Sequence, residues 1–189
     1  MADPLGADVV LPKLRGRFGR DYTFVERCES TQRLLPEDAP EGAVATTNEQ
    51  TAGRGRLGRE WVAPPGSSLL VSIVLRPEVP TANLPELSLV AGRAVARALG
   101  ELAEVKWPND VLLNGRKVAG ILAEAREGRV VLGIGINVSQ SADELPERPV
   151  HPATSLLLET GRATPRADLL AAVLEQLERE YDAWVARYR

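Results

Sequence analysis

The sequence predicts an α/β protein of the α+β type, in which helices pack on a mixed, mostly antiparallel central sheet. Four strand-like segments follow one another without an intervening helix, which favours antiparallel neighbours over a doubly wound sheet. They are residues 104–107, 110–113, 117–125 and 129–138. Long helical periodicity is confined to residues 83–99 and to the segment after Thr164. A length of 189 residues is typical of one domain with one core.

Composition and charge exclude several classes of protein. The 23 basic and 26 acidic residues give a net charge of -3, so no overall positive field draws the chain to nucleic acid or an anionic membrane. No stretch approaches the roughly 20 apolar residues of a membrane span, and the first residues lack the pattern of a secretory signal. Cys28 and His151 are the only residues of their kinds and lie far apart, so neither a disulfide, a Cys/His pair nor a zinc cluster is expected. We expect a cytoplasmic protein that binds neither nucleic acid nor membrane.

The first part of the chain is predicted to contain one short helix and two strands. Residues 1–20 are mixed in composition and rich in Pro and Gly, and are expected to form an N-terminal extension. Ser30 stands where a cap would open a short helix. Residues 42–50 and 67–77 are rich in apolar and β-branched residues, which predicts two strands, the second of them buried.

Two longer helices are predicted to cover the sheet. Asn83 and Glu86 have the spacing of a capping pair and predict a helix that runs to about Leu99. Thr164 as cap and Pro165 at the first helical position predict the last helix. Apolar residues recur along it at three- and four-residue spacing. They are Leu170, Val173, Leu174, Leu177, Tyr181, Trp184 and Tyr188.

The strand predicted over 129–138 is apolar nearly throughout, which predicts a central position in the sheet. It includes the sequence GIGIN at 133–137, with two glycines before Asn137. Glycine inside a strand marks either close approach by a ligand or another backbone, or tight packing beneath a helix. The sequence leaves both open. Residues 139–153 are predicted to form a Pro-rich, acidic loop.

Arginine and glycine alternate in the sequence GRGRLGREW at 53–61. Glycine lets backbone N–H groups approach an anion, and guanidinium groups bind phosphate oxygens in pairs. The letters fit G-x-G-x-x-G, but they lead towards Pro64 and not into a helix, so this is no dinucleotide fingerprint. A phosphate-binding loop, a solvated basic loop and a nucleic-acid contact remain as alternatives, the last weakened by the net negative charge.

The sequence KWPNDVLLNGRKVAG at 106–120 has the pattern of a β-hairpin, with Asn114 and Gly115 in a two-residue turn. That turn fixes the predicted register. The pairs are Leu113 with Arg116, Leu112 with Lys117, Val111 with Val118, and Asp110 with Ala119. Asp110 and Lys117 then share one face of the sheet. They form either part of a site for a metal-bound, phosphate-bearing ligand or a cross-strand salt bridge.

Four blocks taken together resemble the catalytic domain of the biotin–protein ligases, also called biotin–acetyl-CoA-carboxylase ligases. The blocks are Ser30-Thr31-Gln32, EQTAGRGRLGREW (49–61), KWPNDVLLNGRKVAGIL (106–122) and GIGINV (133–138). The resemblance implies a catalytic domain over 21–189, with a fold akin to class II aminoacyl-tRNA synthetases and lipoate ligases. It implies that biotin and MgATP give biotinyl-5′-AMP and pyrophosphate, and that the biotinyl group then passes to a lysine of a biotin carboxyl carrier protein.

The resemblance also implies roles for individual residues. Lys117, Arg54 and Arg56 are the expected catalytic residues, and Asp110 is the expected magnesium ligand. The expected biotin-binding residues are Ser30, Thr31, Gln50, Gly53, Arg54, Lys117 and Gly120. The expected nucleotide-binding residues are Arg54, Gly55, Arg56, Leu57, Gly58, Arg59, Trp61, Asn109 and Asn137. Residues 53–62 are expected to become ordered when the adenylate binds.

The same resemblance leaves alternative functions open, and the sequence departs from the family pattern at both ends. A lipoate or octanoate ligase or transferase, and a sensor that holds biotinyl-adenylate without transfer, are the alternatives. The transferase route needs a catalytic cysteine, and Cys28 precedes all four blocks.

The 20 or so residues before the matching region are too few for the winged-helix domain of some members, so no repressor role is expected. The C-terminal β domain of many members is also expected to be absent. A homodimer is compatible with the sequence.

Overall fold

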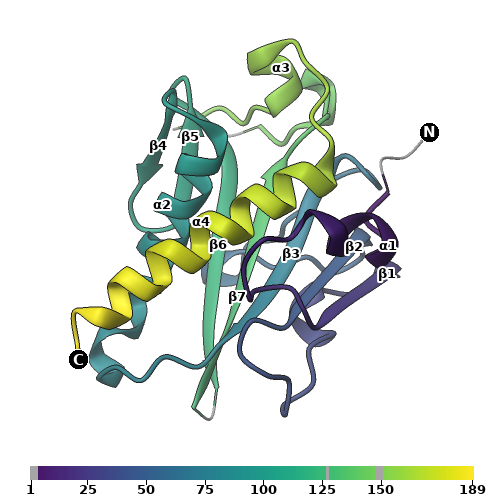
Figure 1. Cartoon of the computed structure of the whole chain (residues 1–189). Helices are drawn as coiled ribbons and strands as arrows, with labels where there is room; N and C mark the ends of the chain where they lie inside the picture. Colours follow the sequence, from purple (N-terminus) through teal and green to yellow (C-terminus); the bar gives the residue numbers. More distant parts are fainter. Residues whose placement is uncertain (1–3, 127, 148–150) are drawn as a thin grey trace.

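Seven strands form one sheet in the computed structural model, in the order β1-β2-β3-β7-β6-β5-β4 (Figure 1). The structure describes residues 4–126, 128–147 and 151–189. The strands are β1 (Tyr22–Cys28), β2 (Val44–Gln50), β3 (Ser68–Leu75), β4 (Ala103–Lys106), β5 (Asp110–Leu113), β6 (Arg116–Arg126) and β7 (Arg129–Asn137). β1 and β2 are parallel, and the other neighbouring pairs are antiparallel. The predicted fold class is confirmed, and β7 is central as predicted.

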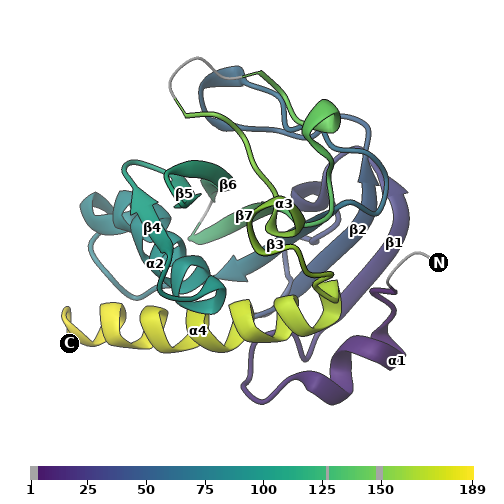
Figure 2. The ribbon, with the colours of Figure 1, turned by 90° about the horizontal axis from the view of Figure 1, so that it is seen from above.

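α2 and α4 lie next to each other on one side of this sheet (Figure 2). The α-helices are α1 (Ala7–Val10), α2 (Leu87–Leu99), α3 (Leu156–Thr160) and α4 (Arg166–Ala186). Short 3-10 turns are η1 (Leu11–Lys13), η2 (Thr31–Arg33), η3 (Arg56–Gly58), η4 (Thr81–Glu86) and η5 (Ala142–Glu144). Among the described residues, no helix combines the length and apolar character needed to cross a membrane.

The alternation of side chains along the central strands separates the core from the opposite sheet face. In β3 and β7 every second residue packs into the main core beneath the helices. These residues are Leu69, Val71, Ile73, Leu75, Val130, Leu132, Ile134 and Ile136. The residues between them include Leu70, Ser72, Gly133 and Gly135, which line a cavity on the other side. The same strands therefore build the core and the floor of a candidate site.

The segment before residue 21 contributes to the main core. Leu5, Val10, Leu14 and Phe18 are all buried there. Arg17 joins this segment to α4 through a two-pronged hydrogen bond to the carboxylate of Asp182. The domain boundary at residue 21 stays a prediction, although the segment before it packs on the same core as the sheet.

Two predicted helices start later than expected, in both cases at a proline. The helix predicted from Asn83 begins as η4, and α2 starts only at Leu87. Pro85 lies inside η4 and has no N–H to donate to a regular α-helical ladder. The last helix starts at Arg166, because Pro165 has an extended backbone and occupies the N-cap.

Other predicted elements in the first part of the chain are shorter than expected or were missed. The helix predicted after Ser30 is the single 3-10 turn η2, and Pro36 follows soon afterwards. β1 and α3 were not predicted. The residues of β1 are half polar and show no regular alternation of buried and exposed positions. The predicted loop 139–153 contains η5, and its residues 148–150 lie outside the described residues.

Candidate active site

A cavity of about 300 Å³ opens on the sheet face opposite α2 and α4. Its volume is in the range of small-molecule sites. Its lining residues come from six segments that are far apart in the sequence: 30–32, 50–61, 70–72, 108–110, 117–122 and 133–135. All four sequence blocks that resemble biotin–protein ligases therefore contribute residues to one cavity.

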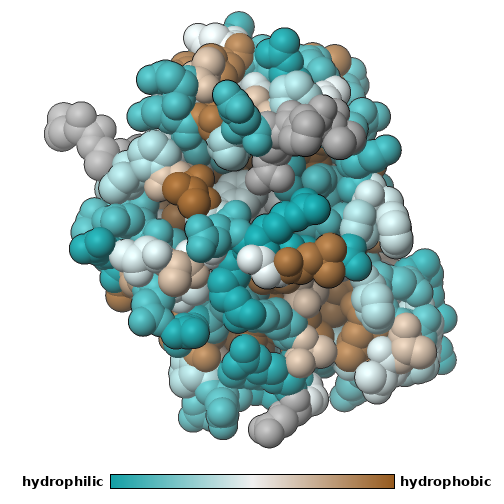
Figure 3. All heavy atoms as spheres, turned by 180° about the vertical axis from the view of Figure 1, so that it is seen from behind, coloured by the Kyte–Doolittle hydropathy of each residue, from teal (hydrophilic) through white to brown (hydrophobic). Residues whose placement is uncertain are grey.

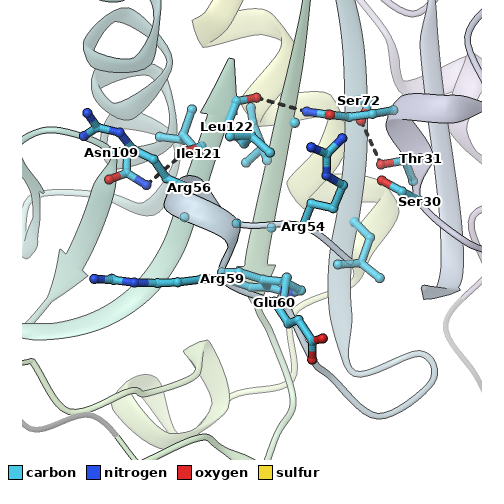
Figure 4. Close-up of a pocket in the computed structure, with 18 of the residues that line it drawn as sticks. Ser30, Thr31, Arg54, Arg56, Arg59, Glu60, Ser72, Asn109, Ile121 and Leu122 are labelled. Atoms are coloured by element: carbon cyan, nitrogen blue, oxygen red, sulfur yellow. Dashed lines mark hydrogen bonds between the residues drawn. The ribbon is translucent and has the colours of Figure 1, made fainter. Parts of the chain in front are cut away.

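One end of the cavity is built from hydroxyl and amide groups, with Arg54 nearby (Figure 4). The backbone N–H of Thr31 donates to Oε1 of Gln50 at 2.8 Å, and the Thr31 hydroxyl lies 3.2 Å from the same oxygen. The Thr31 and Ser72 hydroxyls are 2.7 Å apart, and both side chains are buried. Ser30 is also buried and lines this end. Prearranged hydroxyl and amide groups of this kind can recognise a neutral polar ligand group by its hydrogen bonds.

Glycines on two neighbouring strands make room for an aromatic side chain in the middle of the cavity. Gly120 pairs with Gly135 across β6 and β7, and Gly135 pairs with Leu70 across β7 and β3. A Cβ atom on Gly135 would come within 2.6 Å of Trp61 Cε2, and one on Gly120 within 2.9 Å of Trp61 Cζ3. The indole ring of Trp61 therefore approaches the strands as closely as only glycine permits. Its Nε1 is buried and has no hydrogen-bond partner among the described residues.

A second close approach lies over the next row of strand residues. Gly133 pairs with Ser72, and a Cβ atom on Gly133 would come within 2.9 Å of Gln32 Nε2. That amide nitrogen donates to the carbonyl of Leu122 at 3.2 Å. The glycines of the GIGIN sequence are thus approached by cavity side chains and not by a helix.

The other end of the cavity carries the ion pair of Lys117 and Asp110. Lys117 Nζ lies 2.5 Å from Asp110 Oδ1, and the Lys117 side chain is only 9% exposed. The backbone of Lys117 is held as well: its N–H donates to the carbonyl of Pro152, and its carbonyl accepts from the N–H of Thr154, both at 2.8 Å. Residues 152–154 therefore fix the strand that presents this ammonium group.

The predicted hairpin register is wrong beyond its first two pairs. Leu113 pairs with Arg116 and Leu112 with Lys117, as predicted, but a β-bulge then shifts β6 by one residue. Val111 pairs with Ala119 and Asp110 with Gly120. A bulge inserts one extra residue on one strand and changes the direction of the side chains around it. Asp110 and Lys117 nevertheless meet, as predicted, because the long lysine side chain reaches the carboxylate.

The glycine and arginine loop folds back on itself at the mouth of the cavity. The Trp61 N–H donates to the Gly53 carbonyl at 2.9 Å, and the Gly55 N–H donates to the Arg59 carbonyl at 2.7 Å. A Cβ atom on Gly53 would lie 2.3 Å from the Trp61 carbonyl oxygen, so this closure requires glycine. Arg54, Arg56 and Arg59 line the cavity from this loop (Figure 4), and Arg54 pairs with Glu124 at 3.1 Å.

Most residues predicted from the resemblance line the cavity. They are Ser30, Thr31, Gln50, Arg54, Gly55, Arg56, Leu57, Arg59, Trp61, Asn109, Asp110, Lys117 and Gly120. Three predicted residues do not: Gly53, Gly58 and Asn137. The Asn137 amide is buried, donates to the Thr154 carbonyl and accepts from Gln140. Any role of these three in ligand binding stays a prediction.

Sequence reasoning gave no ligand role to several other lining residues. They include Gln32, Leu70, Ser72, Pro108 and Leu122. Ser72 could have been noticed, because its hydroxyl interrupts an otherwise apolar buried strand, and such a group needs a hydrogen-bond partner. The others carry no comparable signal.

Cys28 lies outside the cavity lining, at the end of β1. Burial raises the pKa of its thiol, which disfavours the thiolate needed by a nucleophile. His151 does not line the cavity either. Within the described residues, no group of three or more His, Cys, Asp or Glu side chains could hold a metal ion by itself.

Comparisons with known proteins agree with this geometry. The model of the biotin/lipoate A/B protein ligase family matches residues 24–141. The chain is 39% identical to the bifunctional ligase/repressor BirA of Bacillus spizizenii, over 86% of this chain and 54% of that protein. It is 41% identical to the biotin–[acetyl-CoA-carboxylase] ligase of Paracoccus denitrificans, over 87% of this chain and 79% of that protein. The chain thus spans about half the length of the Bacillus relative.

A solved structure is similar over nearly the whole chain. The biotin protein ligase of Aquifex aeolicus in complex with biotin and ATP has a TM-score of 0.78 and 35% identity. The similar region covers 89% of this chain and 73% of the Aquifex chain. A structure of the same ligase without ligand has a TM-score of 0.72.

Proposed function

This chain belongs to the biotin/lipoate A/B protein ligase family, and on that premise we propose that it catalyses ATP-dependent biotinylation of a protein. Biotin and ATP give biotinyl-5′-AMP and pyrophosphate, and the biotinyl group then passes to a lysine of a biotin carboxyl carrier protein. The observation that carries the proposal is the polarity of one cavity. Thr31 and Gln50 form a hydrogen-bonding end, and the Lys117 ammonium group, paired with Asp110, lies at the other end. Biotin has the matching polarity, with a neutral ureido ring at one end and a carboxylate at the other.

In the first step, a carboxylate oxygen of biotin attacks the α-phosphorus of ATP. The new bond is an acyl–phosphate P–O bond, and the bond to pyrophosphate breaks, with pyrophosphate taking the electron pair. The enzyme needs no nucleophile of its own, because its task is to bring two anions together and to stabilise the developing charge. Lys117, Arg54 and Arg56 surround the cavity and supply that positive charge.

Magnesium is expected with the nucleotide, and the donor set is compatible with it. Mg²⁺ commonly uses one or two carboxylates together with phosphate oxygens and water, so a cage made only of protein groups is not required. Asp110 supplies one carboxylate in the cavity, and it already faces the Lys117 ammonium group. Asp110 would hold this ion, which would supply neutralisation of phosphate charge.

In the second step, the unprotonated ε-amine of the acceptor lysine attacks the acyl carbon of biotinyl-5′-AMP. A C–N bond forms and the C–O bond to the phosphate breaks. AMP leaves with the electron pair, and the amine proton passes to water. The mixed anhydride is prone to hydrolysis, so the cavity has to exclude water between the two steps. Residues 53–62, at the mouth of the cavity, are the part of the chain that would cover it.

The individual assignments extend this proposal. Ser30, Thr31, Gln50 and Gly120 face the ureido ring or the wall of the biotin pocket, and Lys117 faces the carboxylate. Residues 53–61, with Asn109 and Asn137, bind the nucleotide. Residues 21–189 carry the activity, in the cytoplasm and without nucleic acid. Sedimentation measures the oligomeric state, for which a homodimer is one candidate.

Two assays test the function. Biotin-dependent exchange of labelled pyrophosphate into ATP reports the first step, and transfer of labelled biotin to a recombinant biotin carboxyl carrier domain reports the second. We expect both. Exchange that depends on lipoate or octanoate and not on biotin would assign the chain to the other branch of the family. Exchange without transfer would indicate a sensor of biotinyl-adenylate, and the absence of exchange with any of these acids would refute a ligase function.

A further inference from the structure

Lys106 and Trp107 lie directly beside the cavity and have no part in the proposed chemistry. Trp107 is 75% exposed, although tryptophan is normally mostly buried. The three residues that follow it, 108–110, line the cavity. Lys106 pairs with Asp110 across β4 and β5, and directly paired residues share a sheet face, so Lys106 projects on the cavity side.

The rim of the cavity carries exposed cations and apolar side chains, with Glu60 as an exposed carboxylate among them. Arg56, Arg59 and Lys106 are exposed, and none of the three forms an ion pair within the described part of the chain. Leu57, at the tip of the loop that carries the two arginines, is 82% exposed. Figure 3 shows the face opposite α4, where apolar side chains interrupt a largely hydrophilic surface. An acidic surface with an apolar contact point would complement this rim.

We propose that Lys106, Trp107 and Leu57 form a docking surface for the acidic face of the acceptor protein. The inference rests on the proposed function, in which a lysine of another protein must reach the acyl carbon near Lys117. The protein that presents this lysine has to contact the surface next to the cavity mouth. Trp107 and Lys106 form part of that surface. Exposed tryptophan is the residue most enriched at energetically dominant contacts, and unpaired cations attract an acidic partner and orient it.

A second copy of this chain is a poorer fit to the same surface. A two-fold symmetric contact uses the same patch on both molecules. It would bring Lys106, Arg56 and Arg59 of one copy close to the same cations of the other, which costs free energy. An acidic acceptor protein removes that repulsion.

The test separates the two steps of the reaction in the variants Trp107→Ala and Lys106→Glu. Both residues lie outside the cavity lining, so biotin-dependent pyrophosphate exchange should stay within about twofold of the unchanged protein. Transfer to a recombinant biotin carboxyl carrier domain should show a KM raised about tenfold or more, the effect expected of a dominant interface residue. Hydroxylamine, a small nucleophile that needs no docking, should intercept the adenylate at an unchanged rate.

Matched controls lie away from the cavity. Leu102→Ala removes an apolar side chain that is 69% exposed just before β4, and Arg15→Glu makes a comparable charge change at an exposed residue near η1. Both should leave the KM for the carrier domain unchanged. Raising the ionic strength should reduce kcat/KM for transfer more in the unchanged protein than in Lys106→Glu.

Several results would overturn the docking surface. One is a KM for the carrier domain in Trp107→Ala and Lys106→Glu equal to that of the controls. Another is a loss of self-association in sedimentation with transfer intact, which would assign the surface to a second copy. If the rate at which hydroxylamine intercepts the adenylate falls together with carrier transfer, these residues act in the reaction itself and not in docking. If the unchanged protein shows no exchange, the proposed function fails, and the docking surface fails with it.

Discussion

At the scale of single residues, the position of Lys117 depends on groups from two other parts of the chain. Its ammonium group meets Asp110 of β5, and its backbone is bonded to Pro152 and Thr154. The residue is 7% exposed, so little water competes for its charge. A buried ammonium that already faces one carboxylate is suited to bind a second anion, provided that ligand charge replaces the lost hydration.

Replacing Lys117 with alanine should slow biotin-dependent pyrophosphate exchange on the order of a hundredfold or more, the usual effect of removing a group that stabilises transition-state charge. The variant Lys106→Ala provides the control, since it removes an exposed cation from β4, which β5 separates from the strand of Lys117, and should leave exchange unchanged. An exchange rate in Lys117→Ala within a few-fold of the unchanged protein would contradict the assignment. Thermal unfolding of both variants checks that the fold persists.

Ser72 supports the polar end of the cavity through its contact with the Thr31 hydroxyl. The variant Ser72→Ala should raise the KM for biotin by up to about tenfold, because one hydrogen bond contributes about 0.5–1.5 kcal/mol. The KM for ATP should not change. Ser88→Ala, on α2 at the other side of the sheet, is the control. Equal changes in both KM values would show that Ser72 affects the fold and not biotin binding.

At the scale of elements, residues 53–61 form a loop closed by few hydrogen bonds. Its two ends are tied at Gly53 and Trp61, and Leu57 at the tip has a positive φ of 60°. An exposed tip with so few bonds opens easily, which favours exchange of its backbone protons with water. Trp61 anchors the loop at the cavity floor, because its ring packs closely on Gly120 and Gly135.

Hydrogen exchange in residues 53–62 should slow when biotin and ATP are added, because ligand contacts restrain the loop. Gly135→Ala should speed exchange in the same peptide without ligand, since the new methyl group displaces the Trp61 ring. Gly135 has no positive φ, so alanine fits its backbone. Gly133→Ala, which meets Gln32 and not Trp61, is the matched control. Identical exchange with and without ligands would refute the predicted ordering of this loop.

At the scale of the whole molecule, Glu86 joins the two covering helices far from the cavity. Its carboxylate accepts hydrogen bonds from Asn83, from Trp184 Nε1 and from the Tyr188 hydroxyl, and it pairs with Arg187. The start of α2 is thereby tied to the end of α4. These hydrogen bonds, with that of Asn83 largest, lower the pKa of Glu86 from 4.5 to about 2.

A carboxylate whose pKa is lower in the folded state stabilises the protein above its unfolded pKa, and this contribution is lost as the pH falls through the folded pKa. The free energy of unfolding should therefore decline between about pH 4.5 and pH 2. The variant Glu86→Gln should be less stable at pH 7 and should show a shallower decline, measured by urea unfolding. Glu101→Gln, at an exposed position, is the control. Parallel pH profiles of Glu86→Gln and the unchanged protein would contradict this role.

The sequence predicted those features that depend on local patterns. Apolar periodicity predicted α4 and the central strand β7, and Asn114-Gly115 predicted the turn between β5 and β6. It did not predict β1, whose half-polar residues lack alternation, or the helix starts at Pro85 and Pro165. A strand without periodic residues is defined by its neighbour, here β2, and not by its own composition.

The sequence by itself determined the family, the residues that carry charge and the meeting of Asp110 with Lys117. Only the tertiary structure decided which residues share the cavity. Ser72, Gly133 and Gln32 become neighbours because β3 pairs with β7 and η2 lies over both strands. The bulge in β6 likewise depends on packing, since it buries both Val118 and Ala119. Turns and periodicity are encoded within a few residues, whereas strand register and cavity walls arise from pairings between distant segments.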